Sequence, residues 1–194
     1  MKKPKLPAYR HELPCVILAI DPANTSGWAI MVEGKPKCWG SLAASDSDGI
    51  DRVIFEACDL AIRYKLPLVV LGEEWGRGGI MGRAQWQGLG GAWTAWKYGC
   101  DRARAKGLPV VESRVLRVLQ KVWRSVFGLN LGREVVKAYC LRAARERTGI
   151  ELPPEQHDVA EALLIGLWGA RAAAVGAKLP AKLMERWAAE RADQ

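Results

Sequence analysis

An acidic residue closes the first apolar run of this sequence. Val16–Ile20 contains only apolar residues and is followed directly by Asp21, before a turn-forming stretch at 22–27 and a second apolar run. Such a pattern predicts a strand that is buried on both faces. A buried, ionised carboxylate is unfavourable unless a cation lies beside it, and residues 15–32 contain no Lys or Arg. Asp21 therefore either caps the turn or binds a metal ion.

Four further acidic residues occur where they could meet the first. Glu73 and Glu74 follow another apolar run, Leu66–Leu71, and because side chains alternate along a strand, only one of the two can face a given neighbour. Asp158 and Glu161 are three residues apart near the start of an apolar helical pattern, so they share one helix face. Such a pair, taken alone, is explained by the attraction of carboxylates to the positive end of the helix macrodipole.

Carboxylates that converge in a basic protein favour metal-dependent chemistry on phosphate esters. Mg²⁺ prefers oxygen ligands and is typically bound by one or two carboxylates together with phosphate oxygens of the substrate. Two such ions about 3.5–4 Å apart can activate a water molecule and stabilise the leaving oxygen of a phosphodiester. The chain contains neither a GxxxxGK[ST] phosphate loop nor a GxSxG nucleophile motif. No nucleotide cofactor is therefore expected.

An alternation of strands and helices must position these residues. Strands are expected at 16–21, 26–32, 37–44, 66–71 and 108–112. Helices are expected at 50–64, 92–106, 115–127, 133–148 and 155–173, with a terminal helix at 178–194. The first and fourth strands are the most apolar, so they should be central and adjacent, with a site outside their carboxyl ends. The order βββ-α-β-α-β-α-α-α predicts an α/β domain with a mixed sheet covered by helices.

The composition indicates a folded protein with a polyanionic partner. Among 194 residues, 29 are Lys or Arg and 21 are Asp or Glu, which gives a net charge of +8. Thirteen of the basic residues, against four acidic ones, lie between Lys97 and Arg147. This excess favours nucleic acid over a membrane surface as the partner. The nine tryptophans either pack in the core or stack on exposed bases.

The cysteines and the apolar segments bear on the location of the protein. Five scattered cysteines without a CxxC pair argue against a zinc ribbon or a disulfide framework and for a reducing compartment. No signal peptide is apparent, and the uncharged stretch 162–170 is too short to span a membrane. We therefore expect a cytoplasmic protein, in the host cytoplasm if the source is viral, with no membrane partner.

Three short motifs, taken in order, resemble one known family. They are Ile20-Asp21-Pro22 after the first strand, Gly72-Glu73 after the fourth, and Asp158-Val159-Ala160-Glu161-Ala162-Leu163 in the last core helix. Over residues 15–173 the chain resembles the RuvC family of Holliday-junction resolvases, which are RNase H-like, Mg²⁺-dependent endonucleases. The resemblance implies a mixed central sheet of about five strands flanked by helices over 15–176. A basic arm at 1–14 and a helical extension at 177–194 would flank this domain.

The resemblance also implies an activity and the residues that perform it. The chain would resolve four-way DNA junctions as a homodimer, by phosphodiester hydrolysis with two Mg²⁺ ions per site, for which Mn²⁺ could substitute. Asp21 would bridge both ions, and Glu73 would bind one of them. Asp158 and Glu161 would bind the other.

Further residues are expected beside the ions or on the DNA. Glu74 and His157 would lie next to the metal ligands, although His157 could also bind an ion or act as an ordinary helix-cap residue. A glycine-rich loop expected at 75–91 would carry an aromatic side chain, Trp75 or Trp86, that enters the junction or packs on the following helix. Basic residues would contact phosphates, one of them at the cut site. The candidate DNA-binding residues are Trp75, Arg77, Arg83, Trp86, Lys121, Arg124, Arg133 and Lys137.

The sequence departs from the family pattern at two places, and two other functions are compatible with it. Ala23-Asn24 follows the Asp-Pro pair where the family usually has Gly, and Glu161 stands where Asp is usual. The small size of the chain, the departure at Ala23-Asn24 and the Gly- and Trp-rich loop make it look more like the divergent phage members. A nuclease of the same fold could instead cut other branched DNA or RNA–DNA hybrids. A non-catalytic DNA-binding protein would use its basic half for binding and its acidic residues for structure.

Overall fold

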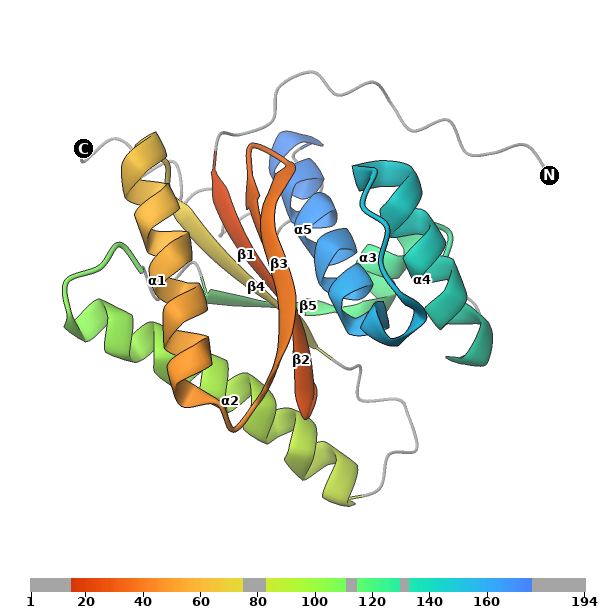
Figure 1. Cartoon of the computed structure of the whole chain (residues 1–194), viewed down its shortest axis with the longest axis horizontal. Coiled ribbons are helices and arrows are strands. Elements are labelled where there is room, and N and C mark those ends of the chain that lie inside the picture. Colours follow the sequence, from red (N-terminus) through yellow and green to blue (C-terminus); the bar gives the residue numbers. More distant parts are fainter. Residues whose placement is uncertain (1–14, 75–82, 111–114, 130–132, 176–194) are drawn as a thin grey trace.

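The structure is a computed structural model that describes residues 15–74, 83–110, 115–129 and 133–175. Figure 1 shows a central sheet with helices on both sides. The strands are β1 (Val16–Asp21), β2 (Thr25–Val32), β3 (Lys35–Ala43), β4 (Leu68–Glu74) and β5 (Val115–Leu119). The helices are α1 (Ser47–Tyr64), α2 (Arg83–Ala105), α3 (Gln120–Val126), α4 (Arg133–Thr148) and α5 (His157–Val175), with the 3₁₀ turn η2 (Pro154–Gln156) before α5.

β1 lies at the centre of the five-stranded sheet. Its neighbours are β2, which is antiparallel, and β4, which is parallel, and the full order is β3-β2-β1-β4-β5. Ile20 of β1 lies opposite Gly72 of β4. The next residue of each strand, Asp21 and Glu73, therefore extends from the same face of the sheet, side by side. The expected mixed sheet, with its two most apolar strands adjacent at the centre, is confirmed.

The two faces of β1 are buried by different helices. Ile17 and Ala19 belong to a core under α3, α4 and α5, whereas Val16, Leu18 and Ile20 belong to a core with residues of α1 and α2. In Figure 1, these two helix groups lie on opposite sides of the strands. A strand covered on both faces needs apolar side chains at every position, which explains the unbroken apolar run in the sequence.

A two-residue turn joins β2 to β3. Glu33 and Gly34 form it with positive φ angles of 51° and 74°, the backbone that matches the twist of a tight hairpin. Glycine adopts such angles without steric penalty, whereas a glutamate does so rarely. The hairpin expected from the sequence is confirmed, and its strands begin one or two residues earlier than expected.

The fifth strand differs from its expected position. The strand expected at 108–112 is wrong, because residues 108–110 form no strand and β5 occupies 115–119, the first part of the helix expected at 115–127. The segment VLRVL pairs in parallel with β4, from Val70 to Glu74. Pairing at the edge of a preformed sheet overrides the helical periodicity of the segment, so α3 begins only at Gln120.

Other boundaries shift by a few residues. β4 continues to Glu74, so Glu73 lies within the strand, opposite Val118. α2 begins at Arg83, inside the loop expected at 75–91. The arm expected at 1–14 and the extension expected at 177–194 lie outside the described residues, and the domain limits stay predictions. Within the described residues, no helix has the length and apolar character needed to cross a membrane.

Gly27 of β2 is expected to be essential for the docking of α5. A Cβ atom at this position would overlap the backbone of Asp158, so Gly27→Ala should push the helix away from the sheet. Overpacking of this kind typically costs about 1–3 kcal/mol, and the melting temperature should fall by several degrees. Thermal and urea unfolding measure the change.

Gly91→Ala is the matched control, because no atom of the described residues lies within 4 Å of its added Cβ. This substitution in α2 should be neutral or stabilise the protein by up to about 1 kcal/mol. Equal melting temperatures for Gly27→Ala and the unsubstituted protein would contradict the role assigned to Gly27.

Candidate metal centre

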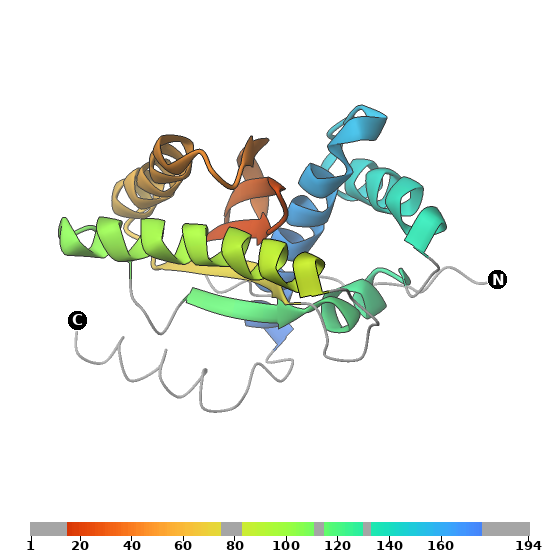
Figure 2. The same ribbon diagram turned by 90° about the horizontal axis from the view of Figure 1, so that it is seen from below.

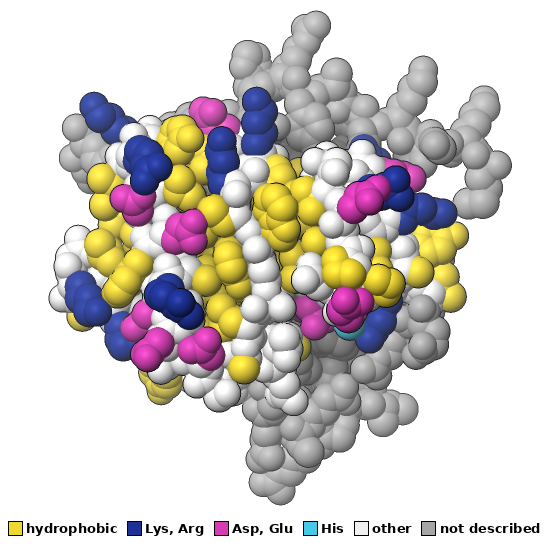
Figure 3. All heavy atoms as spheres, viewed as in Figure 1, with side chains coloured by type: hydrophobic (Ala, Val, Ile, Leu, Met, Phe, Trp, Pro, Cys, Tyr) yellow, Lys and Arg dark blue, Asp and Glu magenta, His cyan; other side chains and the backbone are white. Residues whose placement is uncertain are grey.

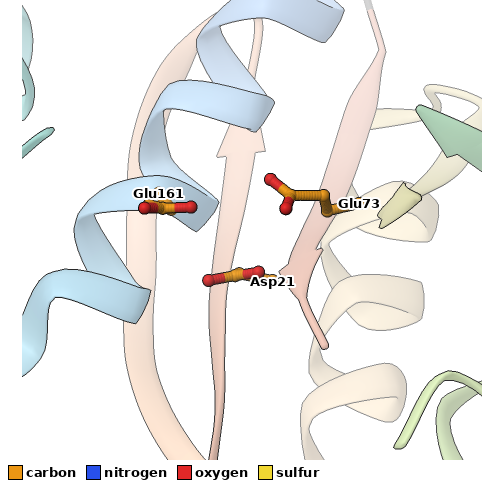
Figure 4. A group of neighbouring side chains, drawn as sticks. All are labelled: Asp21, Glu73 and Glu161. Carbon is orange, nitrogen blue, oxygen red and sulfur yellow. The ribbon is translucent and has the colours of Figure 1, made fainter. Parts of the chain in front are cut away.

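Three acidic side chains from three elements point toward one another near the C-terminal ends of β1 and β4 (Figure 4). Asp21 ends β1, Glu73 lies one residue before the end of β4, and Glu161 lies near the start of α5. One carboxylate oxygen of each lies within 4.8 Å of the other two, and each residue is at most 6% exposed. The spacing is close enough for the three groups to share a divalent cation.

Glycines at the interface with the sheet let α5 approach closely enough to deliver Glu161. A Cβ atom on Gly166 would come within 2.7 Å of the Met31 side chain, and one on Gly169 would overlap Leu71. Both positions lie further along α5 from the acidic end, against β2 and β4. The depth at which the carboxylate enters the site therefore depends on these small residues.

Glu73 is held by two donors from α3. The Gln120 side-chain amide donates to its Oε1 at 2.7 Å, and the indole N–H of Trp123 donates to its Oε2 at 2.9 Å. Both carboxylate oxygens of Glu73 therefore have a partner, and Trp123 is itself fully buried. α3 thus orients this side chain toward the other two acids.

Glu161 of α5 forms an ion pair with Arg124, which belongs to α3, the helix that also holds Glu73. The Nη2 atom of Arg124 lies 3.0 Å from Oε1 and 2.8 Å from Oε2 of the carboxylate, and the side chains are only 14% and 7% exposed. The Cys140 thiol lies 3.7 Å from Oε1 of the same group. Among the basic candidates whose side chains are described, Arg124 contacts the carboxylate cluster.

Burial and mutual repulsion raise the pKa of two of the carboxyl groups. For Asp21, burial is the main cause of a strongly raised pKa, and the neighbouring carboxylates add to it. For Glu73, burial and then the charge of Glu161 raise the pKa to about 8, although Arg124 and the donors on α3 lower it. Without a metal ion, the cluster therefore holds protons near neutral pH that a divalent cation would displace.

Asp158 lies outside the group of three. Its carboxylate is a quarter exposed and pairs with the His157 ring, with Nε2 2.8 Å from Oδ1. Burial raises the pKa of Asp158, and the nearby His157 and Lys137 lower it. Its charge in turn contributes to the raised pKa of Asp21. The structure thus brings three of the four expected carboxylates together and places the fourth close by, next to the histidine.

The remaining sequence candidates are one residue with a described side chain and seven others. Lys137 is an exposed residue of α4. Outside the described residues lie Trp75 and Arg77, together with the side chains of Glu74, Arg83, Trp86, Lys121 and Arg133.

Two neighbours of the cluster were missed from the sequence, Gln120 and Trp123. Together with Arg124 they have spacings of three and four residues, which place them on one face of a helix. This spacing can be read in the sequence, within the helix expected at 115–127. Its true start at Gln120 depends on the pairing of β5.

Figure 2 shows α2 running alongside β5. A separate hollow of about 400 Å³ is lined by residues of these two elements, on the face of the sheet opposite the carboxylates. It is lined by Trp93, Lys97, Asp101, Arg104, Val115 and Arg117. Arg104 forms an ion pair with Asp101 at 2.6 Å, and the Arg117 guanidinium lies 5.5 Å from the centre of the Trp93 ring. The hollow is a basic surface that the sheet separates from the carboxylates.

The site belongs to an α/β fold of the RNase H-like class, and solved structures of RuvC share it. No family model and no curated protein matches the chain. The RuvC of Thermus thermophilus in complex with a Holliday junction substrate aligns with a TM-score of 0.55 and 21% identity, over 84% of this chain and 96% of that one. A second Thermus thermophilus RuvC structure aligns with a TM-score of 0.56 and 19% identity, over 83% and 96%.

A more distant match is the yeast mitochondrial Holliday junction resolvase Ydc2, with a TM-score of 0.49 and 14% identity, over 91% of this chain and 86% of that one. The two bacterial structures are the ones that bear on the fold. The chain has a RuvC-like fold, and the fold class expected from the sequence is confirmed.

Glu73 should make the stability of the metal-free protein depend on pH. Its pKa rises from 4.5 to about 8 on folding, so the folded state retains a proton that the unfolded chain loses. The free energy of unfolding should therefore fall as the pH increases between these values. One pKa unit corresponds to about 1.4 kcal/mol. Glu73→Gln, which has no proton to lose, should be more stable than the unsubstituted protein at pH 8 by about 2 kcal/mol or more.

Urea unfolding in EDTA at pH 5 and pH 8 measures this difference. Glu146→Gln changes an exposed residue of α4 in the same way and should not alter the pH profile. Parallel profiles for Glu73→Gln and the unsubstituted protein would show that Glu73 does not carry the proton.

Proposed function

We propose that this chain is a metal-dependent endonuclease that cuts four-way DNA junctions. The observation that carries the proposal is the buried group Asp21, Glu73 and Glu161, whose oxygens converge at the ends of β1 and β4 and the start of α5. The RuvC-like fold supports it, since the RuvC of Thermus thermophilus has been solved with a Holliday junction substrate. The resemblance of the three sequence motifs points in the same direction.

The donor set fits hard divalent cations. Carboxylate oxygens are the ligands that Mg²⁺ and Mn²⁺ prefer, and burial without full charge compensation favours binding of a cation. Asp21, Glu73 and Glu161 would hold the ions, with Asp158 completing the set from the rim. Two Mg²⁺ ions would activate the attacking water and stabilise the leaving oxygen.

The other residues of the site orient the carboxylates and neutralise negative charge. Gln120 and Trp123 hold the Glu73 carboxylate in place through both of its oxygens. His157 holds Asp158 at the edge of the cluster. Arg124 supplies a positive charge within the site, where a substrate phosphate would bring negative charge.

DNA binding and dimerisation form the second part of the proposal. The net charge of +8 favours contact with phosphates. Figure 3 shows acidic and basic side chains interspersed over α1, so the positive charge does not gather on that part of the surface. The basic hollow between α2 and β5 and the exposed Lys137 are better placed to contact duplex arms. Paired cuts in a junction of two-fold symmetry call for a homodimer, and a cytoplasmic location accords with such a role.

Removal of Asp21 should abolish cleavage. Asp21→Asn keeps the size of the side chain but removes the charge that would bind the ions. Mutation of a residue that only hydrogen-bonds to a metal ligand typically lowers metal affinity or activity about 10–100-fold. For the ligand Asp21 itself, we therefore expect the cleavage rate to fall more than about 100-fold. The measurement is gel-based cleavage of a synthetic four-way junction with end-labelled arms and Mg²⁺. Asp59→Asn, at an exposed ion pair on α1, is the control and should cleave normally.

The same assay separates the alternatives. Equal cleavage of an RNA–DNA hybrid or of other branched DNA would favour a nuclease of broader selectivity. Tight junction binding without cleavage at any Mg²⁺ or Mn²⁺ concentration would favour a non-catalytic DNA-binding protein. Unchanged cleavage by Asp21→Asn would disprove the proposed metal centre.

Mg²⁺ should stabilise the folded protein. A ligand at a hundred times its dissociation constant adds about 2.7 kcal/mol, which raises the melting temperature of a chain of this size by roughly 5–10 °C. The shift should follow the metal concentration and should be largely lost in Asp21→Asn. Identical melting curves in EDTA and in excess Mg²⁺ or Mn²⁺ would argue against metal binding.

A further inference from the structure

Arg124 binds the Glu161 carboxylate, which is one of the proposed metal ligands. Its Nη2 atom lies within 3.0 Å of both oxygens of Glu161, and the pair is shielded from water. A guanidinium and a divalent cation both bind to the lone pairs of carboxylate oxygens, so Glu161 cannot bind both fully at the same time. The guanidinium therefore supplies positive charge at the carboxylate where a metal ion would supply it.

The hydrogen bonds of Arg124 are incomplete. Its Nε atom is buried and has no hydrogen-bond partner among the residues that the structure describes, while its guanidinium lies 5.2 Å from the centre of the Trp123 ring. A buried donor without a partner is destabilising. Withdrawal from Glu161 toward water or a phosphate would satisfy this donor, so the observed position is one that the side chain can leave.

The three carboxylates differ in their hydrogen-bond and ion-pair partners. Both oxygens of Glu73 accept hydrogen bonds from α3, and both oxygens of Glu161 contact Arg124. Within the described part of the chain, no donor is bonded to Asp21. An incoming ion therefore meets an available carboxylate on β1 and an occupied one on α5.

We propose that Arg124 and the metal ions compete for Glu161, with the guanidinium on the carboxylate in the metal-free protein and displaced when metal binds. The inference rests on the proposed metal centre. The displaced guanidinium is free to bind a phosphate, the other anion that arginine recognises well. Arg124 is thus a positioning residue that couples loading of the site with metal to an open position for the DNA backbone.

Metal affinity without DNA tests the competition. If Arg124 lies on Glu161 in about nine of ten metal-free molecules, the apparent dissociation constant is raised about tenfold. Arg124→Met should then bind Mn²⁺ about tenfold more tightly than the unsubstituted protein, as measured by calorimetric titration. Its circular dichroism spectrum and melting temperature establish beforehand that it is folded.

Lys137→Met is the matched control for charge. Lys137 is close enough to lower the pKa of Asp158, but it is exposed and forms no ion pair with the three buried carboxylates in the described structure. Its removal should change Mn²⁺ affinity by less than about twofold, because water and salt screen an exposed charge. An equal gain in both variants, or no gain in Arg124→Met, would overturn the proposal.

The unsubstituted protein offers a second test that no folding defect can obscure. The buried Arg124 Nε–H should give a slowly exchanging signal in ¹⁵N NMR spectra of the metal-free protein. Addition of Mg²⁺ should shift this signal and accelerate its exchange with water. An unchanged signal at saturating Mg²⁺ would overturn the proposal, whereas failure of the proposed function would appear separately as absence of junction cleavage by the unsubstituted protein.

Discussion

Repulsion between three buried carboxylates is the constraint around which this site is built. Asp21, Glu73 and Glu161 are removed from water and held within 4.8 Å of one another, and each additional charge makes the others less favourable. α3 compensates with two donors and one guanidinium, and protons on the acids reduce the rest. Apolar side chains of similar size would be as stable or more so. The cluster therefore adds little to stability, which accords with the proposed role of the three carboxylates in binding a cation.

The fold keeps these mutually repelling groups together by surrounding them with apolar contacts. β1 is covered on both faces, and α5 packs against it and its neighbours through glycines that leave room for close approach. The parallel register of β1 and β4 sets two of the carboxylates side by side. Because the strands and α5 are packed elements, the acids stay close together, and protons, the partners on α3 or a bound cation can reduce their repulsion.

Much of this arrangement could be predicted from the sequence. The apolar runs identified β1 and β4, and their acidic ends pointed to Asp21 and Glu73. The prediction failed at β5, because VLRVL has no local feature that separates an edge strand from the start of a basic helix. That error hid the face of α3, and with it the partners of Glu73. Asp158, in the first turn of the expected helix, lies with His157 instead of in the group of three.

The sequence by itself determined which side chains can do chemistry and which strands carry them, since apolar runs and the acids that end them are local patterns. It also determined the RNase H-like order of elements. Only the tertiary structure decided that Arg124 lies on Glu161, that α3 holds Glu73, and that a basic hollow forms on the opposite face. Those features depend on β5 pairing with β4 and on helices packing across the sheet. Such contacts join segments far apart in the chain, and no local spacing encodes them.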